Sequence, residues 1–245
     1  MIDLERDGEL FILTMNDGEN RWNTTYVRAF AKALDEVEAS SGPAALVTRS
    51  ADGKFFSNGL DLEWISTGAA ADQSAEGHRG GDRSVFGDEF MALMGRIITL
   101  PVPTVAAING HGFGAGFMTA LCHDVRIMRS DRGFLCANEM QLGMVIPRPE
   151  LALFRHKLSA STFFETVQLA RRWAGPDALA AGIVSQIAAA DEVFDLACKR
   201  ARELAPLGAN RVAYGSQKES LFGENSALNE PHGAAHMLKH GHDFH

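Results

Sequence analysis

The stretch that decides the fold reads TVAAINGHGFGAGFMTALCHDVRIM and occupies positions 104–128. Its two ends, 104–108 and 125–128, are short runs of small, apolar or β-branched residues, which are typical of strands. Between them the chain turns at NGHGFGAG and enters an apolar helix through FMTALC. A glycine-rich turn that joins a strand to a helix leaves backbone amides at the helix N-terminus, where partial positive charge favours an anion.

The same alternation continues on both sides of this stretch. Apolar runs at 9–15, 44–49 and 133–137 predict further strands, and helical spacing predicts helices at 24–39 and 84–98. Strands that alternate with helices in this way indicate an α/β fold of stacked ββα units with mainly parallel sheets. From about residue 159 the pattern becomes helical, with helices expected at 163–172, 176–181, 193–204 and 209–222.

These changes of pattern suggest three regions: a ββα core at 1–158, a helical region at 159–222 and a tail at 223–245. The tail is rich in Gly, Asn and His, and we expect it to be poorly ordered, or ordered only against a neighbouring subunit. Its histidines lack a carboxylate or cysteine that would complete a ligand set, so no metal is predicted. Residues 66–84 are small, polar and glycine-rich, as in a surface loop.

Composition excludes several classes of function. The chain has 245 residues, 46% of them hydrophobic, and a formal charge of -8, so nonspecific binding to nucleic acid or to an anionic membrane is not expected. The sequence contains no run of about 18 apolar residues, so no membrane span is predicted. The acidic start MIDLERDGEL is unlike a signal peptide, and three scattered cysteines fit a reducing compartment. The expected location is therefore cytoplasmic.

A second loop, KFFSNGLDL at 54–62, also follows a strand. Its glycine lets the backbone bend so that the next amide, that of Leu60, points outward instead of into a sheet. Together with the amides of Ala115 and Gly116, which fall at the helix N-terminus, it could form an oxyanion hole, a set of donors that stabilises a developing negative charge. Each loop on its own is equally well explained as a tight turn that needs glycine.

Taken in order, the two loops and a third segment, GFLCANEMQLGMVIP at 133–147, resemble the motifs of the crotonase (enoyl-CoA hydratase/isomerase) superfamily. The likeness runs from about residue 9 to about residue 205. It implies a crotonase-like spiral of ββα units, a C-terminal helical region for trimerisation, and a homotrimer or hexamer. It also implies an acyl-CoA thioester as substrate and no cofactor besides the CoA that the substrate carries.

Carried over by motif position, the resemblance gives the oxyanion hole the backbone N–H groups of Leu60 and Ala115. Ala115 stands where the family usually has glycine, which is acceptable if its φ is negative. Lys54 becomes a candidate contact for the CoA phosphates, although it could equally be a solvated lysine, and Ser57 and Asn58 lie near the adenine.

The carboxylates point to a reaction type. Hydratases of the superfamily use two glutamates, but here the first position is Met118 and only the second, Glu139, is acidic. A thioether cannot activate water, so the pair resembles the single-glutamate Δ3,Δ2-enoyl-CoA isomerases, in which Glu139 would move a proton from C2 to C4. Trp64, Met118 and Leu142 are expected at the acyl pocket. Burial among Met118, Leu142 and Met144 should raise the pKa of Glu139.

Other interpretations stay open at this point. Glu139 could cap a turn or pair with Arg126, Arg129 or Arg132. The chain could be a hydratase or another crotonase-type lyase or hydrolase that uses Glu63 or Glu150, or a noncatalytic acyl-CoA-binding protein. Bulky residues at 148–154 replace a stretch that is often glycine-rich in the family, so the length of the acyl chain is not determined.

Overall fold

The computed structural model describes residues 1–66, 82–223 and 234–240. Its strands are β1 (Ile2–Asp7), β2 (Leu10–Met15), β3 (Ala45–Ser50), β4 (Phe55–Ser57), β5 (Thr104–Ile108), β6 (His111–Phe113), β7 (Val125–Arg129), β8 (Leu135–Cys136) and β9 (Gln186–Ala188). Its α-helices are α1 (Thr24–Ala39), α2 (Leu62–Ser66), α3 (Asp82–Ile98), α4 (Ala115–Cys122), α5 (Arg148–Lys157), α6 (Ala160–Val167), α7 (Gly175–Ala180), α8 (Val193–Leu204), α9 (Arg211–Phe222) and α10 (Ala234–Lys239). Two 3-10 helices cover Glu139–Leu142 and Ala205–Ala209.

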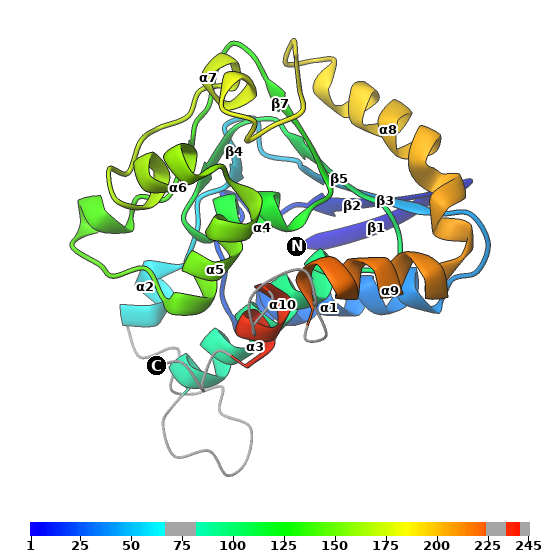
Figure 1. The fold of residues 1–245 in the computed structure, drawn as a ribbon, viewed down its shortest axis with the longest axis horizontal. Helices are drawn as coiled ribbons and strands as arrows, with labels where there is room; N and C mark the ends of the chain where they lie inside the picture. The colour runs from blue at the N-terminus through cyan, green and yellow to red at the C-terminus, as the bar shows by residue number, and fades with distance from the viewer. Residues whose placement is uncertain (67–81, 224–233, 241–245) are drawn as a thin grey trace.

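The strands form two sheets that the chain visits in turn. The large sheet has the order β1-β2-β3-β5-β7-β9 and the small one the order β4-β6-β8. Strands β3, β5 and β7 of the large sheet are each followed by a short strand of the small sheet, and helices separate these pairs. All neighbouring strands are parallel except β1 and β2. The predicted spiral of ββα units is therefore confirmed (Figure 1).

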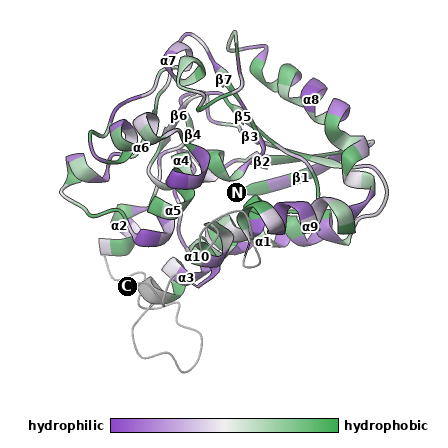
Figure 2. Cartoon of the chain, in the orientation of Figure 1, coloured by the Kyte–Doolittle hydropathy of each residue, from purple (hydrophilic) through white to green (hydrophobic). Residues whose placement is uncertain are grey.

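Alternate residues of the large sheet enter two separate cores. Val47, Val105 and Ile127 pack on one face against α8, which covers that face in Figure 1. Their neighbours Leu46 and Ala106 point to the opposite face and join a larger core with α1, α3 and α4. This division follows from the two-residue period of a strand. Figure 2 shows that α8 carries both hydrophobic and hydrophilic residues, as a helix with one buried face does.

A buried histidine fixes α4 to the large sheet. His123 Nδ1 lies 2.8 Å from the carbonyl oxygen of Thr119, and Nε2 lies 2.8 Å from the hydroxyl of Thr48 on β3. Because a carbonyl can only accept, Nδ1 carries the proton and Nε2 accepts from Thr48. Burial lowers the pKa of His123 to about 4, so the ring is neutral at neutral pH.

Several predicted boundaries were wrong. The helix expected at 163–172 is α6, which begins three residues earlier behind the cap Ser159, whose hydroxyl accepts from the Thr162 amide (3.3 Å). It ends before Ala170, whose φ of 48° is not helical. The segment 159–222 is also not purely helical, because β9 pairs with β7 and completes the large sheet.

The expectation of a poorly ordered tail was wrong for 234–239. These residues form α10, which packs against α3 and α5 and buries Ala234 and Leu238 completely. Positions 224–233 and 241–245 lie outside the described residues, as do 67–81 of the expected surface loop. Within the ranges that the structure describes, no helix is long and apolar enough to cross a membrane and no group of side chains is suited to hold a metal ion. The three cysteines are free and buried.

Candidate active site

The first loop holds the Leu60 amide away from the sheet. Gly59 has a φ of 83°, a value that favours glycine. On either side of Leu60, the Trp22 amide donates to the Gly59 carbonyl and the Asp61 amide donates to the Trp22 carbonyl, both at 2.9 Å. Trp22 is fully buried, so this anchor is rigid. Within the described parts of the chain, the Leu60 amide donates no hydrogen bond.

The second loop leads into α4. Gly114 has a φ of 47°, and its amide donates to the Cys136 carbonyl at 2.9 Å. The carbonyl of Gly114 accepts from the amides of Phe117 and Met118, which starts the helix and leaves Ala115 in its first turn. The Ala115 amide likewise has no acceptor among the described residues. In those residues only Asn20 and Ala170 combine a side chain with positive φ, so the condition set for Ala115 is met.

The two loops touch. A Cβ atom added to Gly59 would lie 2.7 Å from the Phe113 carbonyl oxygen and 3.8 Å from the Ala115 amide nitrogen. Leu60 and Ala115 border the same cavity, which has a volume of about 380 Å³. Two unpaired backbone donors at one cavity are suited to receive negative charge on an oxygen atom.

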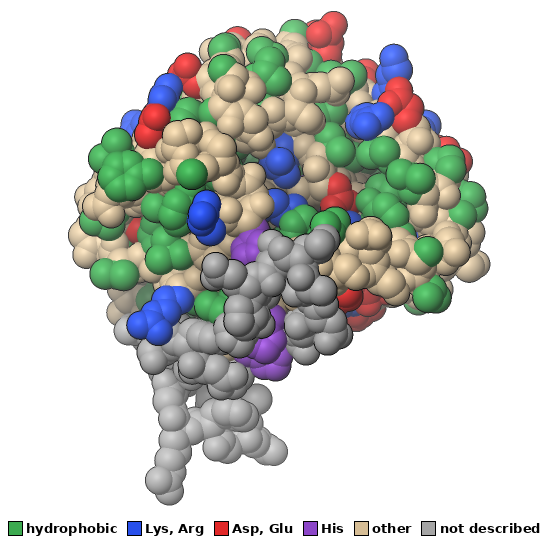
Figure 3. Space-filling view, in the orientation of Figure 1, with side chains coloured by type: hydrophobic (Ala, Val, Ile, Leu, Met, Phe, Trp, Pro, Cys, Tyr) green, Lys and Arg blue, Asp and Glu red, His purple; other side chains and the backbone are tan. Residues whose placement is uncertain are grey.

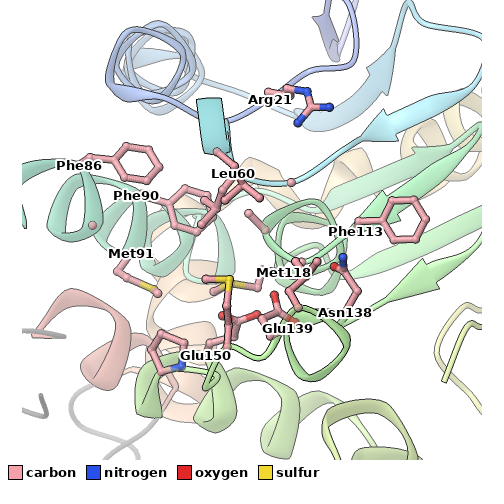
Figure 4. Close-up of a pocket in the computed structure, with 18 of the residues that line it drawn as sticks. Arg21, Leu60, Phe86, Phe90, Met91, Phe113, Met118, Asn138, Glu139 and Glu150 are labelled. Carbon is pink, nitrogen blue, oxygen red and sulfur yellow. The ribbon is translucent and has the colours of Figure 1, made fainter. Parts of the chain in front are cut away.

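The cavity is mostly apolar with a few polar groups, as small-molecule sites are. Its apolar lining residues include Leu60, Leu62, Phe86, Phe90, Met91, Met118, Leu142, Met144 and Val145. Its polar lining side chains are Arg21, Asn58, Asp88, Asn138, Glu139 and Glu150. Figure 4 shows Leu60, Met118, Glu139 and Glu150 grouped around the same space.

Glu139 lies beside the second loop. It opens the 3-10 helix Glu139–Leu142, and a Cβ atom added to Gly114 would come within 2.7 Å of its Oε1. Its Oε2 is buried and has no hydrogen-bond partner in the described part of the chain. Removal from water raises the pKa of this carboxyl above its ordinary value, against a smaller effect of a backbone hydrogen bond. A carboxylate with a raised pKa and an unused oxygen is equipped to accept a proton.

The proposed pairing of Glu139 with a nearby arginine is not observed. The Arg126 guanidinium donates to the carbonyls of Ile183 and His123, and that of Arg129 is paired with Asp131 at 2.8 Å. The ion pairs found among the described residues do not include one between Arg132 and Glu139.

A second carboxyl group, Glu150, lies on the cavity wall. It occupies the first turn of α5, and it is only 5% exposed. Its Oε1 has no hydrogen-bond partner within the described ranges. Burial raises its pKa well above the ordinary value, and the charge of Glu139 adds to this effect. From the sequence it was one alternative carboxylate among two, because nothing in the local pattern shows which face of α5 meets the cavity.

Other expected site residues occupy different places. Met118 is 1% exposed and lines the cavity. Leu142 also lines the cavity. Asn58 also lines it, and its amide group donates to Glu19 at 2.8 Å. The prediction for Trp64 needs correction, because this ring does not line the cavity and packs edge-on against Phe86, which does, at 5.4 Å.

Three more side chains lie away from the cavity wall. The Ser57 hydroxyl is fully buried and donates to the Asn20 carbonyl at 2.7 Å. Lys54 is exposed, with its Nζ 4.7 Å from the centre of the Phe55 ring. Glu63 is exposed on α2 and does not contribute to the cavity. Sequence reasoning missed Arg21, whose guanidinium borders the cavity and pairs with Glu19 at 2.6 Å.

The winding of ββα turns and the cavity between the two loops define a crotonase-type protein. A family model described as enoyl-CoA hydratase/isomerase matches residues 5–231. The chain therefore belongs to the enoyl-CoA hydratase/isomerase family.

Comparison with individual proteins gives the same result. The chain is 32% identical over 229 residues to peroxisomal enoyl-CoA delta isomerase 2 of Arabidopsis thaliana, covering 91% of this chain and 93% of the relative. It is 28% identical to a carnitinyl-CoA dehydratase of Salmonella, covering 82% and 73%. An apo structure of an enoyl-CoA isomerase from Mycobacterium tuberculosis superposes with a TM-score of 0.79 at 25% identity, covering 99% and 96%.

Proposed function

We propose that this chain is an acyl-CoA isomerase that shifts the double bond of a 3-enoyl-CoA to give a trans-2-enoyl-CoA. The observation that carries the proposal is the carboxyl group of Glu139, with an unused buried oxygen, in the same apolar cavity as the Leu60 and Ala115 amides. The names of the Arabidopsis relatives, all enoyl-CoA delta isomerases, support it.

In this reaction the thioester oxygen accepts hydrogen bonds from the Leu60 and Ala115 amides, and Glu139 removes a proton from C2. The electron pair spreads over a dienolate, and a proton added at C4 leaves the double bond between C2 and C3. Each oxyanion donor contributes about 2.7–4 kcal/mol in comparable sites, and a positioned base contributes about 10² to 10⁴ in rate. Met118, which can neither donate a proton nor take one from water, disfavours hydration at the same position.

The proposal extends to the rest of the substrate and to assembly. Asn58 would lie near the adenine, while Lys54, exposed at the surface, would approach the phosphates. Exposed apolar side chains such as Phe164 and Val212 support a homotrimer or hexamer, and Figure 3 shows hydrophobic surface near α6. The cytoplasmic location stays a prediction, since two of the Arabidopsis relatives are named as peroxisomal.

The test is a spectrophotometric assay with 3-hexenoyl-CoA, in which the conjugated product absorbs. The wild-type protein should form it, and Glu139→Gln should lower the rate by at least about 10²-fold while CoA-ester binding is kept. A Glu139→Gln variant that retains the wild-type rate would show that another group is the base.

A second candidate is a hydratase or dehydratase that uses Glu139 together with Glu150. Its specific support is that Glu150, unlike Glu63, lines the cavity, and that a carnitinyl-CoA dehydratase is among the relatives. Formation of 3-hydroxybutyryl-CoA from crotonyl-CoA faster than isomerisation of 3-hexenoyl-CoA would select this candidate instead.

A further inference from the structure

Two carboxyl groups, each with a buried oxygen that lacks a partner in the described chain, line one cavity. They are Glu139, from the turn that follows β8, and Glu150, from the first turn of α5. Figure 4 shows both side chains reaching into the same space near Met118. A buried polar atom without a partner costs about 1–3 kcal/mol, so folding alone does not account for either oxygen.

The two groups differ in burial, and this decides which of them holds a proton. Two carboxylates in an apolar cavity cannot readily both be charged, so one of them stays protonated. Glu150 is 5% exposed, whereas Glu139 is only half-buried. The charge of Glu139 also raises the pKa of Glu150. Glu150 is therefore the neutral acid of the pair, and Glu139 is the carboxylate.

We propose that Glu150 donates the proton at C4 while Glu139 accepts the proton from C2. This inference rests on the proposed isomerase function. The C2–H bond breaks and an O–H bond forms on Glu139; the electron pair moves through the dienolate to C4. There a C–H bond forms with the proton of Glu150, and the double bond settles between C2 and C3. The products are a neutral Glu139 and a charged Glu150, and one proton passed from Glu139 to Glu150, directly or through solvent, restores the starting state.

The placement of the two groups on different elements supports this division of labour. Glu139 Oε1 lies next to Gly114, which precedes α4, so its carboxyl is placed beside the oxyanion loop. Glu150 approaches from α5, a separate helix whose Leu153 and Phe154 are fully buried and fix its orientation. Glu139 can thus remove the proton at C2 while Glu150 protonates C4. A single carboxyl would have to move between the two carbon atoms.

The experiment follows deuterium from C2 in a single turnover. The enzyme, in excess, converts 3-hexenoyl-CoA with two deuterium atoms at C2, in ordinary water, and mass spectrometry and NMR locate the label in the product. The wild-type protein should place protium at C4, because Glu150 enters the turnover with a solvent-derived proton. In Glu150→Gln only Glu139 can return the deuteron, so label at C4 should rise and the rate should fall by about 10²-fold.

Controls keep the outcomes apart. Glu63→Gln removes an exposed carboxyl outside the cavity and should leave rate and label unchanged. Glu150→Asp keeps an acid and should still give protium at C4, which tests the idea if the glutamine variant does not fold. Deuterium at C4 with the wild-type protein, or an unchanged rate and label in Glu150→Gln, overturns the role of Glu150 and leaves the isomerase standing. Absence of conjugated product with the wild-type protein overturns both.

Discussion

Substitution of Gly114 by alanine displaces the Glu139 carboxyl and also strains the backbone that precedes the Ala115 amide. The added Cβ would lie 2.7 Å from Glu139 Oε1, whereas ordinary contacts begin at 3.4 Å. Since Oε1 is the end of a flexible side chain, a retreat of the carboxyl by about 0.7 Å relieves this contact. A misplacement of about 1 Å at a reacting group can cost about 10²-fold in rate, so we expect a loss of about 10- to 100-fold.

The backbone penalty of this substitution has a matched control. Gly114 has a φ of 47° with a ψ of -115°, and Gly18 has a φ of 51°, so alanine is strained at either position. A Cβ atom at Gly18, however, meets nothing within 4 Å. Gly18→Ala should therefore lose stability and keep the wild-type rate.

Urea unfolding would measure the stability of both variants, and initial rates with 3-hexenoyl-CoA would be taken well below their unfolding temperatures. Equal rates for Gly114→Ala and Gly18→Ala at equal stability would refute the reasoning, because a displaced Glu139 would then not matter. A Gly114→Ala variant that binds CoA esters normally but turns over slowly would agree with it.

Three further outcomes follow from the structure. Gly59→Ala should lower the free energy of unfolding by about 1–3 kcal/mol more than Gly42→Ala, because the Cβ added at Gly59 would meet the rigid Phe113 carbonyl at 2.7 Å. Gly42 has a similar φ but open space around it, and urea unfolding compares the two variants. Folding raises the pKa of Glu150, so the folded state keeps a proton that the unfolded chain releases, and stability should fall as pH rises from about 4.5 through the folded pKa. Glu150→Gln should flatten this slope in urea midpoints measured across that range. An unchanged slope would contradict the assignment. Because the pKa of His123 is lowered to about 4, the free energy of unfolding should decrease by about 3 kcal/mol as pH falls from about 6.5 towards 4. His123→Gln should remove that loss in the same measurement.

Long periodic elements were predictable from the sequence. Helix α1 (Thr24–Ala39) matches the predicted range because its buried residues recur at helical spacing. Strand β5 also matches, as a buried run between a proline-containing breaker and a glycine turn. The short strands β4, β6 and β9 have three residues each, too few for a period to be visible. Helix α5 was missed because Pro147 and Pro149 look like breakers, although both lie where a helix begins and proline is tolerated.

Some parts of the candidate site were likewise predictable from the sequence and others were not. The sequence by itself determined the two glycine loops, the presence of Glu139 and the replacement of a second glutamate by Met118, because these are local facts about residue type and order. Only the tertiary structure decided that Gly59 touches the second loop and that the Trp64 ring packs against Phe86. It alone brought Glu150 to the cavity, since this position depends on how α5 packs over α4. Contacts between distant segments, and the burial that shifts a carboxyl pKa, arise from packing and have no local signature in the chain.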